Sequence, residues 1–251
     1  MNYKVYNAQM VKSSYDKLFF VDKVFDVDVI VDFGCADGAI TEMIKGYFPE
    51  AVVIGYDKYQ KNESTSDIIY AKKLSEIKKL IKGKKALLVM NSVVHEIFNY
   101  ERNPFSLLGM LFSMGFEYVW IRDLYIKPSV FGDEIAFSTL AERLREKYPE
   151  QVAEFEKVYG SVFLSENALH FLMKFRYVEN WKRELKEDYT KFRWNFPQME
   201  RLLYAKGYEE EIRDFYVLPY VRKINMEEFD IDLKNQGYTH YRGLFRKIKR
   251  T

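Results

Sequence analysis

The sequence predicts an α/β fold, in which a doubly wound and mostly parallel sheet carries a helical insertion after its fifth strand. An apolar strand runs directly into a glycine-bearing turn at VIVDFGCADG, residues 29–38. Strand-like and helix-like segments then alternate at regular spacing as far as Leu124, which is typical of parallel sheets with right-handed crossovers. Between 127 and 195 the chain has helical segments but no convincing strand, which indicates the insertion.

The first five strands are expected where short β-branched or aliphatic runs end at polar or glycine-bearing turns. These runs cover 28–33, 51–56, 67–71, 84–91 and 117–124. Amphipathic spacing and glycine stops predict helices over 8–24, 39–47, 74–81 and 104–114. The polar stretch 58–66 stands where such a fold normally has a helix, so we expect that helix to be shortened or lost.

The second half of the chain has a different pattern. Its predicted elements are the helical stretch 127–195, broken at Pro149, at Gly160 and near Asn180, then a helix over 197–206 closed by Gly207, and two strands at 211–221 and 240–248. We interpret 127–195 as a helical insertion or lid within a single domain that spans 1–251.

Composition places the chain among globular proteins with a sizeable core. Of its 251 residues, 48% are hydrophobic and 30% charged, and the formal net charge of +2 excludes a strongly basic nucleic-acid coat. The single cysteine, Cys35, allows no intramolecular disulfide and no zinc site, and is typical of a reducing compartment. Without an apolar run of 18 residues or a signal-peptide pattern, we expect a cytoplasmic protein that does not enter a membrane.

The glycine-bearing turn has the character of a nucleotide-like ligand site. Gly34 and Gly38 allow a sharp turn and a close approach of the backbone to a ligand. The next strand ends at Asp57, close to the spacing of roughly 20 residues at which a ribose-binding acid is expected. One carboxylate would then hold the sugar hydroxyls.

Charge near this turn distinguishes between cofactors. Asp32 and Asp37 would repel a pyrophosphate, but they suit the ammonium and sulfonium of S-adenosyl-L-methionine. The dinucleotide spacing also fails, because Ala36 stands where the second glycine should be. The turn therefore favours S-adenosyl-L-methionine over NAD.

These residues resemble a known superfamily. VDFGCADG, followed by a strand that ends in Asp57, is similar to the first two cofactor motifs of the class I S-adenosylmethionine-dependent methyltransferases, which have a Rossmann-like fold. The resemblance implies a methyltransferase and gives the following roles: Gly34, Cys35, Ala36 and Gly38 wrap the methionine part, Asp57 binds the ribose hydroxyls, Lys58 packs on adenine, and Asp32 helps to place the amino group. Ala36 departs from the usual glycine, and a positive φ there would cost about 1 kcal/mol.

Acceptor chemistry is expected beyond the carboxyl ends of the fourth and fifth strands, where NSVVHE and RDL stand. Asn91 and Ser92 can offer hydrogen bonds near the methionine part. His95 is the best candidate for the base that removes the acceptor's proton, although it could instead cap or pack its helix. Glu96 is a second catalytic candidate whose alternative is a solvated helix-start carboxylate. Arg122 and Asp123 could form a structural ion pair.

The acceptor itself is left open by the sequence. A small molecule is favoured, because the near-neutral charge and an aromatic lid suit an enclosed pocket. The insertion also interleaves aromatic and basic residues, as an RNA-stacking surface would: Phe171, Phe175, Arg176, Tyr177, Trp181, Lys182, Arg183, Lys191, Phe192, Arg193 and Trp194. The alternatives are therefore an RNA-directed methyltransferase, or a cofactor-fold module without turnover that binds RNA. A nicotinamide-dependent oxidoreductase is disfavoured by the acidic turn.

Overall fold

The computed structural model describes residues 14–59, 62–129, 134–175, 180–234 and 236–248. The chain divides into two compact units. We call the first the sheet unit, formed by the described residues of 14–123, Asn195–Asp214 and 242–248. The second is the helical unit, formed by those of Leu124–Trp194 and Phe215–Tyr241.

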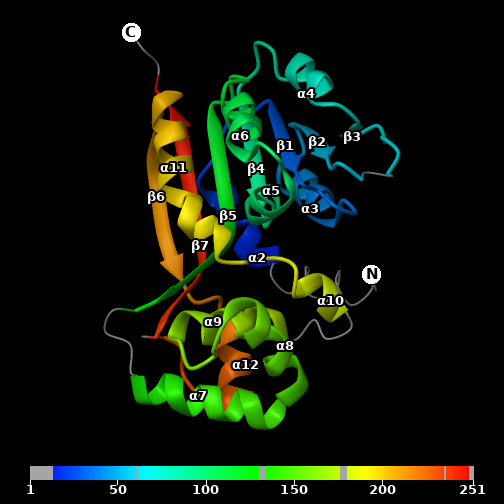
Figure 1. Cartoon of the computed structure of the whole chain (residues 1–251). Helices are drawn as coiled ribbons and strands as arrows, with labels where there is room; N and C mark the ends of the chain where they lie inside the picture. Colours follow the sequence, from blue (N-terminus) through cyan, green and yellow to red (C-terminus); the bar gives the residue numbers. More distant parts are fainter. Residues whose placement is uncertain (1–13, 60–61, 130–133, 176–179, 235, 249–251) are drawn as a thin grey trace. The chain divides into compact units, whose positions relative to one another are not determined.

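Seven strands form one sheet. They are β1 (Val29–Phe33), β2 (Val52–Tyr56), β3 (Ile68–Ala71), β4 (Ala86–Asn91), β5 (Tyr118–Pro128), β6 (Tyr208–Tyr216) and β7 (Gly237–Lys247). Their order is β3-β2-β1-β4-β5-β7-β6 (Figure 1). The pairs among the first five strands are parallel. Lys247 N, at the end of β7, donates to the Glu117 carbonyl beside the start of β5, so β7 runs antiparallel to β5. The predicted doubly wound, mostly parallel sheet is confirmed.

Burial explains why the central strands have no polar alternation. All residues of β1 and β4 are buried, as expected when helices cover both faces of a parallel sheet. On one face Ile30, Leu87 and Trp120 share a core with Ile40 and Ile44 of α3 (Ala39–Tyr47). The same face carries Asp32 and Asn91, because side chains two residues apart point to one side of a strand.

The helices follow the predicted alternation closely in the first half of the chain. Besides α3, the sheet unit contains α2 (Ser14–Lys17), the 3-10 helix η1 (Phe19–Asp22), α4 (Leu74–Leu80), α5 (Val94–Tyr100) and α6 (Pro104–Phe112). The described part of 58–66 contains no helix, as expected. Among the described helices, none combines the length and the apolar content that crossing a bilayer requires.

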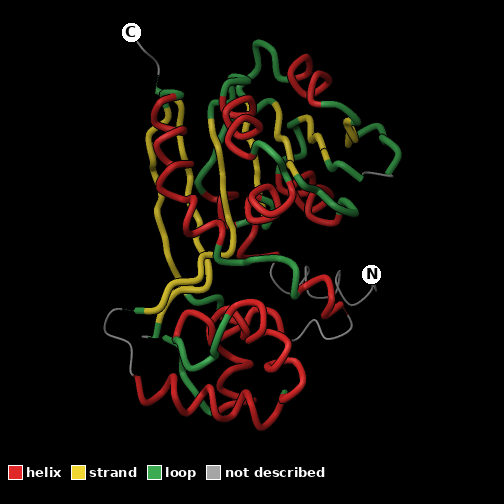
Figure 2. The backbone as a smooth tube through the Cα atoms, viewed as in Figure 1, coloured by secondary structure: helices red, strands yellow, loops and turns green. Residues whose placement is uncertain are grey.

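The helical unit has its own core. Its helices are α7 (Glu134–Lys147), α8 (Pro149–Tyr159), α9 (Ser165–Lys174), α10 (Trp181–Glu184) and α12 (Pro219–Phe229), and α11 (Lys191–Ala205) begins in it. α7, α8, α9 and α12 are grouped together (Figure 1, and Figure 2 in the same view), and α7, α8 and α9 contact one another. Phe155, Phe171 and Leu172 lie fully buried at the centre. Pro149 begins α8, since a proline at the first helical position loses no hydrogen bond.

Three predicted elements need correction. The leading helix expected over 8–24 is broken in its described part into α2 and η1, because Phe20 turns inward to pack on Trp120 at a ring-centroid distance of 5.6 Å; residues 8–13 lie outside the described residues. The helix expected from 197 instead begins at Lys191, directly after a turn in which the Asp188 carboxylate accepts the Thr190 N–H at 2.9 Å.

The third correction concerns the strand expected over 211–221. It is wrong beyond Tyr216, since Pro219 begins α12. A proline fits the first turn of a helix better than the interior of a strand. The interpretation of 127–195 as a lid within one domain stays a prediction.

Candidate functional site

The turn after β1 has an unusual backbone. Gly34, Ala36 and Gly38 all have positive φ, at 84°, 47° and 87°. A Cβ atom on Gly34 would lie 2.5 Å from Cγ2 of Val93, so only glycine fits there. Ala36 does adopt the positive φ that the sequence made a concern, at a cost of about 1 kcal/mol. The Ala36 N–H donates to Asp57 Oδ2 at 3.1 Å, which helps to hold that conformation.

Residues from the neighbouring strands enclose this turn. Cys35 packs with Ile68 and Tyr70 in a small buried cluster, and burial raises the pKa of its thiol well above the ordinary value. The thiol is therefore a packing group rather than a nucleophile. Asn62 Nδ2 donates to the Asp37 carbonyl at 2.6 Å, and a Cβ on Gly38 would collide with the Tyr70 hydroxyl.

Asp57 stands at the carboxyl end of β2, beside the turn. Its Oδ2 accepts from Ala36 N, and its Oδ1 accepts from Tyr59 N at 2.9 Å. A carboxylate offers about four lone-pair sites, so two sites are left for a ligand. The next residue, Lys58, is exposed and pairs with Glu101 at 3.2 Å.

Asp32, at the end of β1, is buried and accepts a hydrogen bond from Thr41 Oγ1 at 2.7 Å. Burial raises its pKa to about 6, while the Thr41 hydrogen bond and the positive charge of Lys17 oppose the shift and Asp57 adds to it. Lys17, also buried, has its pKa lowered to about 7 by burial and by Arg122. The cluster holds opposite charges away from water, where each is strongly affected by its neighbours.

Asn91 and Ser92 follow at the end of β4. Asn91 Oδ1 accepts from Trp120 Nε1 at 3.2 Å, which fixes the amide so that Nδ2 faces away from the indole. Within the described parts of the chain, this buried Nδ2 has no hydrogen-bond partner. Ser92 has a positive φ of 54°, and its hydroxyl accepts from Arg122 Nη1 at 2.9 Å.

His95 lies in the first turn of α5 and is buried. Its Nδ1 is 2.6 Å from Oδ1 of Asp123, whose Oδ2 accepts the backbone N–H groups of Val94 and His95. Arg122 pairs with Asp16 at 2.6 Å, so Asp123 faces α5 while its neighbour faces α2. Glu96 is half-buried on the next position of the helix.

Most of the described aromatic residues of the insertion are not exposed, as those of a base-stacking surface would be. Phe171, Phe175 and Trp181 are buried in the core of the helical unit and Phe192 is buried as well, whereas Trp194 is 63% exposed. Buried rings cannot stack on bases, which favours the packed interpretation of this segment. Arg176 and Tyr177 lie outside the described residues.

Several residues of the site escaped the sequence analysis. Lys17 and Thr41 were unassigned, Tyr70 was only part of a strand, and Asp123 was expected in an ion pair. Only Asp123 carried a usable signal, since it stands next to the strand end that was expected to face the substrate. β5 in fact continues to Pro128, but its pairing with β4 ends at Arg122, so both strands deliver their residues to the same edge.

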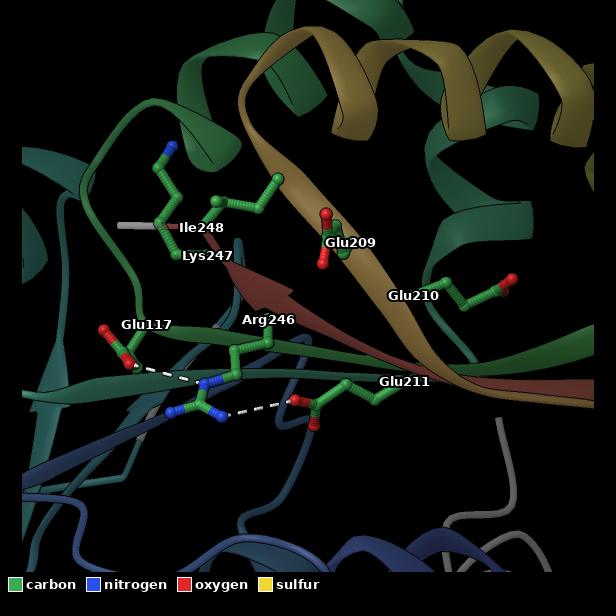
Figure 3. Close-up of a pocket in the computed structure, with 7 residues that line it drawn as sticks. All are labelled: Glu117, Glu209, Glu210, Glu211, Arg246, Lys247 and Ile248. Carbon is green, nitrogen blue, oxygen red and sulfur yellow. Dashed lines mark ion pairs between the residues drawn. The ribbon is translucent and has the colours of Figure 1, made fainter. Parts of the chain in front are cut away.

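A separate hollow of about 350 Å³ lies elsewhere in the sheet unit (Figure 3). It is found where β5 and β6 begin and β7 ends, which is the opposite end of the parallel strands from the glycine turn. Its lining residues are Glu117, Glu209, Glu210, Glu211, Arg246, Lys247 and Ile248. Arg246 bridges Glu117 at 3.7 Å and Glu211 at 3.6 Å. This hollow is therefore distinct from the predicted site.

Comparison with known proteins gives structural neighbours only. No family model matches the sequence, and no curated protein matches it. The fold is similar to that of a SAM-dependent methyltransferase from Archaeoglobus fulgidus, with 13% identity, a TM-score of 0.50, and coverage of 98% of this chain and 100% of that chain.

Two further structures show weaker likeness. The plantazolicin methyltransferase BamL, solved with a triazolic desmethylPZN analog and SAH, has 11% identity, a TM-score of 0.45, and coverage of 95% of this chain and 84% of that chain. A cyclopropane-fatty-acyl-phospholipid synthase-like protein from Lactobacillus casei has 12% identity, a TM-score of 0.41, and coverage of 93% and 90%. Identities this low concern the fold alone. From its strand order and its likeness to the first of these neighbours, the chain has a Rossmann-like α/β fold.

Proposed function

We propose that this chain binds S-adenosyl-L-methionine at the turn after β1 and transfers its methyl group to a small-molecule acceptor. One observation carries the proposal: the carboxylates of Asp32 and Asp57 flank a turn with three positive φ angles at the carboxyl ends of adjacent strands. Ligands of open α/β sheets bind at that edge. The two carboxylates favour a ligand with an ammonium and a sulfonium over one with a pyrophosphate.

Each predicted cofactor residue has a role in this proposal. Asp57 uses its two remaining lone-pair sites for the ribose hydroxyls, and the stem of Lys58 packs on adenine. Asp32 attracts the amino group through its charge, while the turn itself, Gly34, Cys35, Ala36 and Gly38, surrounds the methionine part. Asn91 supports the same placement, since its unmatched Nδ2 suits a carboxylate or carbonyl oxygen of the ligand.

The acceptor would then lie near His95, which serves as the base in this proposal. Gly34 closely approaches Val93, which immediately precedes α5, so the turn and this helix lie against each other. Glu96 stays a second candidate on the same helix. The burial of Phe171, Phe175, Trp181 and Phe192 disfavours an RNA-stacking surface, and so supports a small acceptor over RNA. An RNA-directed enzyme, or an RNA-binding module without turnover, is the alternative.

Calorimetric titration tests the cofactor part of the proposal. We expect S-adenosylmethionine and S-adenosylhomocysteine to bind, and NAD not to bind. The Asp57→Ala variant should weaken both adenosyl ligands by more than about 1 kcal/mol through loss of charged hydrogen bonds. A matched control is Asp28→Ala, an exposed acid that accepts from Lys85 N at the other end of β1.

Two results would count against the proposal. Equal affinity in Asp57→Ala and the wild type would remove the ribose assignment. Tight binding of NAD with no binding of S-adenosylmethionine would replace methyl transfer by the oxidoreductase alternative. RNA binding that weakens with salt, without methyl transfer, would favour the binding module.

A further inference from the structure

Asp123 makes more hydrogen bonds in the sheet unit than a residue in a simple ion pair needs. Its Oδ2 accepts from Val94 N at 2.6 Å and from His95 N at 3.1 Å. Its Oδ1 lies 2.6 Å from His95 Nδ1. The side chain is fully buried on β5, so these bonds form away from water. One carboxylate thus fixes the start of α5 and the ring of a residue on that helix.

The contact between Asp123 and His95 favours a proton on Nδ1 of the ring. An ionised carboxylate only accepts hydrogen bonds, so the Nδ1 facing it must be the protonated nitrogen of a neutral ring. Nε2 is then the nitrogen with a lone pair. A base needs such a lone pair, and a partner fixed on the other nitrogen selects the tautomer that provides it.

We propose that Asp123 is the positioning residue of the methyl-transfer site, holding His95 in the tautomer whose Nε2 takes the acceptor's proton. This inference rests on the proposed function. As the acceptor's oxygen, nitrogen or sulfur attacks, its bond to the methyl carbon forms and the bond from that carbon to the sulfonium breaks. The bonding pair returns to sulfur, which becomes a neutral thioether, and the acceptor's proton moves to Nε2.

The carboxylate contributes at the end of this step as well. When Nε2 gains the proton, the ring becomes an imidazolium, and Asp123 lies 2.6 Å from it with the opposite charge. Because the pair is buried, the hydrogen bond between the imidazolium and the carboxylate is stronger than it would be in water. The acceptor class that such a base serves is one whose attacking atom carries a proton, such as a hydroxyl group, rather than a tertiary amine or a thioether.

A purely structural role for Asp123, as the cap of α5, makes a different prediction. Capping uses only Oδ2 and the two backbone N–H groups. The capping of α5 would therefore not depend on which nitrogen of the His95 ring is protonated. The tautomer is therefore the measurement that separates the two roles.

The experiment is nitrogen-15 NMR of the full chain labelled at histidine, at a pH where the rings are neutral. The chain has 3 histidines, and His95→Gln assigns the signal of His95 by its loss. In the wild type we expect a protonated Nδ1 and an unprotonated Nε2. In Asp123→Asn the backbone N–H groups of Val94 and His95 continue to donate to the amide oxygen, so the NH₂ group of the new side chain faces Nδ1. The proton should then move to Nε2, reversing the dominant tautomer.

Asp28→Asn is the matched control, because Asp28 also accepts a backbone N–H, from Lys85 at 2.7 Å, far from His95 along the strands. It should leave the tautomer unchanged. A wild-type ring with its proton on Nε2, or an unchanged ring in a folded Asp123→Asn, would overturn the inference. If Asp123→Asn fails to fold, the wild-type spectrum decides alone. Titration of the same samples with S-adenosylmethionine distinguishes failure of the proposed function from failure of this inference. If the wild type does not bind S-adenosylmethionine, the proposed function is contradicted, whereas the tautomer assignment is not affected.

Discussion

Both units bury charged residues, but they differ in whether the buried polar groups find hydrogen-bond partners within the protein. In the helical unit, Lys174 donates to the backbone carbonyls of Glu184 and Glu187 and lies 3.8 Å from the ring centroid of Tyr189. The Tyr189 hydroxyl in turn donates to the Glu184 carboxylate. Among the described residues, this cluster leaves no buried side-chain nitrogen or oxygen unmatched.

In the sheet unit, the buried polar side chains at the carboxyl ends of β1 and β4, Asp32 and Asn91, are not all matched by hydrogen bonds. Asn91 Nδ2 is buried without a hydrogen-bond partner among the described residues, and the neighbouring Asp57 has lone-pair sites to spare. A buried cluster whose hydrogen-bond partners all come from the protein contributes to stability. Unmatched donors and acceptors at the carboxyl ends of strands are instead typical of a ligand site. The comparison predicts opposite responses to mutation in the two units.

The largest effect is expected in the helical unit. Lys174→Met removes the buried cation and leaves the Glu184 carboxylate without its charge partner, which should lower the free energy of unfolding by about 3–5 kcal/mol. Urea unfolding measures this. The control is Lys157→Met, an exposed lysine on α8, which should change stability by less than about 0.5 kcal/mol. A Lys174→Met variant as stable as the wild type would make the comparison untenable.

In the sheet unit, Asp32→Asn should raise the free energy of unfolding, the opposite of the effect of Lys174→Met. Because burial raises the pKa of Asp32 from 3.8 to about 6, its stabilising contribution is complete below pH 4 and is lost as the pH rises through 6. At pH 8 the variant should therefore be more stable than the wild type by up to about 3 kcal/mol, with no difference at pH 4. Its affinity for S-adenosylmethionine should fall by about 1 kcal/mol or more. Destabilisation at pH 8 without loss of affinity would identify Asp32 as a structural group.

Gly34→Ala sharpens the comparison at the turn itself. The positive φ and the close approach of Val93 should lower the free energy of unfolding by about 2 kcal/mol and weaken cofactor binding. Gly46→Ala is the matched control, because Gly46 is an exposed helical glycine with open space around it and should gain about 0.5–1 kcal/mol. Equal responses of the two glycines in urea unfolding would show that the turn is not constrained.

The smallest effect is expected for Ala36→Gly. Relief of the positive φ should stabilise the chain by about 0.5–1 kcal/mol, measured by thermal or urea unfolding. Cofactor affinity should stay the same, because the proposed binding mode uses only the backbone of this residue. A loss of stability would mean that the methyl group of Ala36 contributes packing that outweighs its strain.

The fold of the first half could be predicted because its signals are local. β1 and α3 follow from an apolar run, a glycine turn and an amphipathic segment, and α3 begins and ends at the predicted residues. The second half depends on packing at long range. The expected strand through 221 failed because Val217 and Val221 have strand propensity, while burial of Val221 and Phe229 in the helical core favours α12.

The candidate site divides in the same way. Asp32, the turn and Asp57 could be found because fixed spacing along the chain encodes them. The bond between His95 and Asp123 joins a side chain of α5, the helix after β4, to one on β5, and so depends on the register of β4 with β5. Lys17 comes from an N-terminal helix whose placement no local pattern encodes. The roles of all predicted site residues stay predictions until a ligand is bound.

A crystal structure of the chain grown with S-adenosylhomocysteine tests the central claim most directly. The account predicts that the homocysteine part of the ligand lies along the turn from Gly34 to Gly38, with both ribose hydroxyls on Asp57, the adenine beside Lys58, and a ligand oxygen on Asn91 Nδ2. An adenosyl group bound away from β1 and β2, with Asp57 contacting only Ala36 and Tyr59 as it does here, would contradict it.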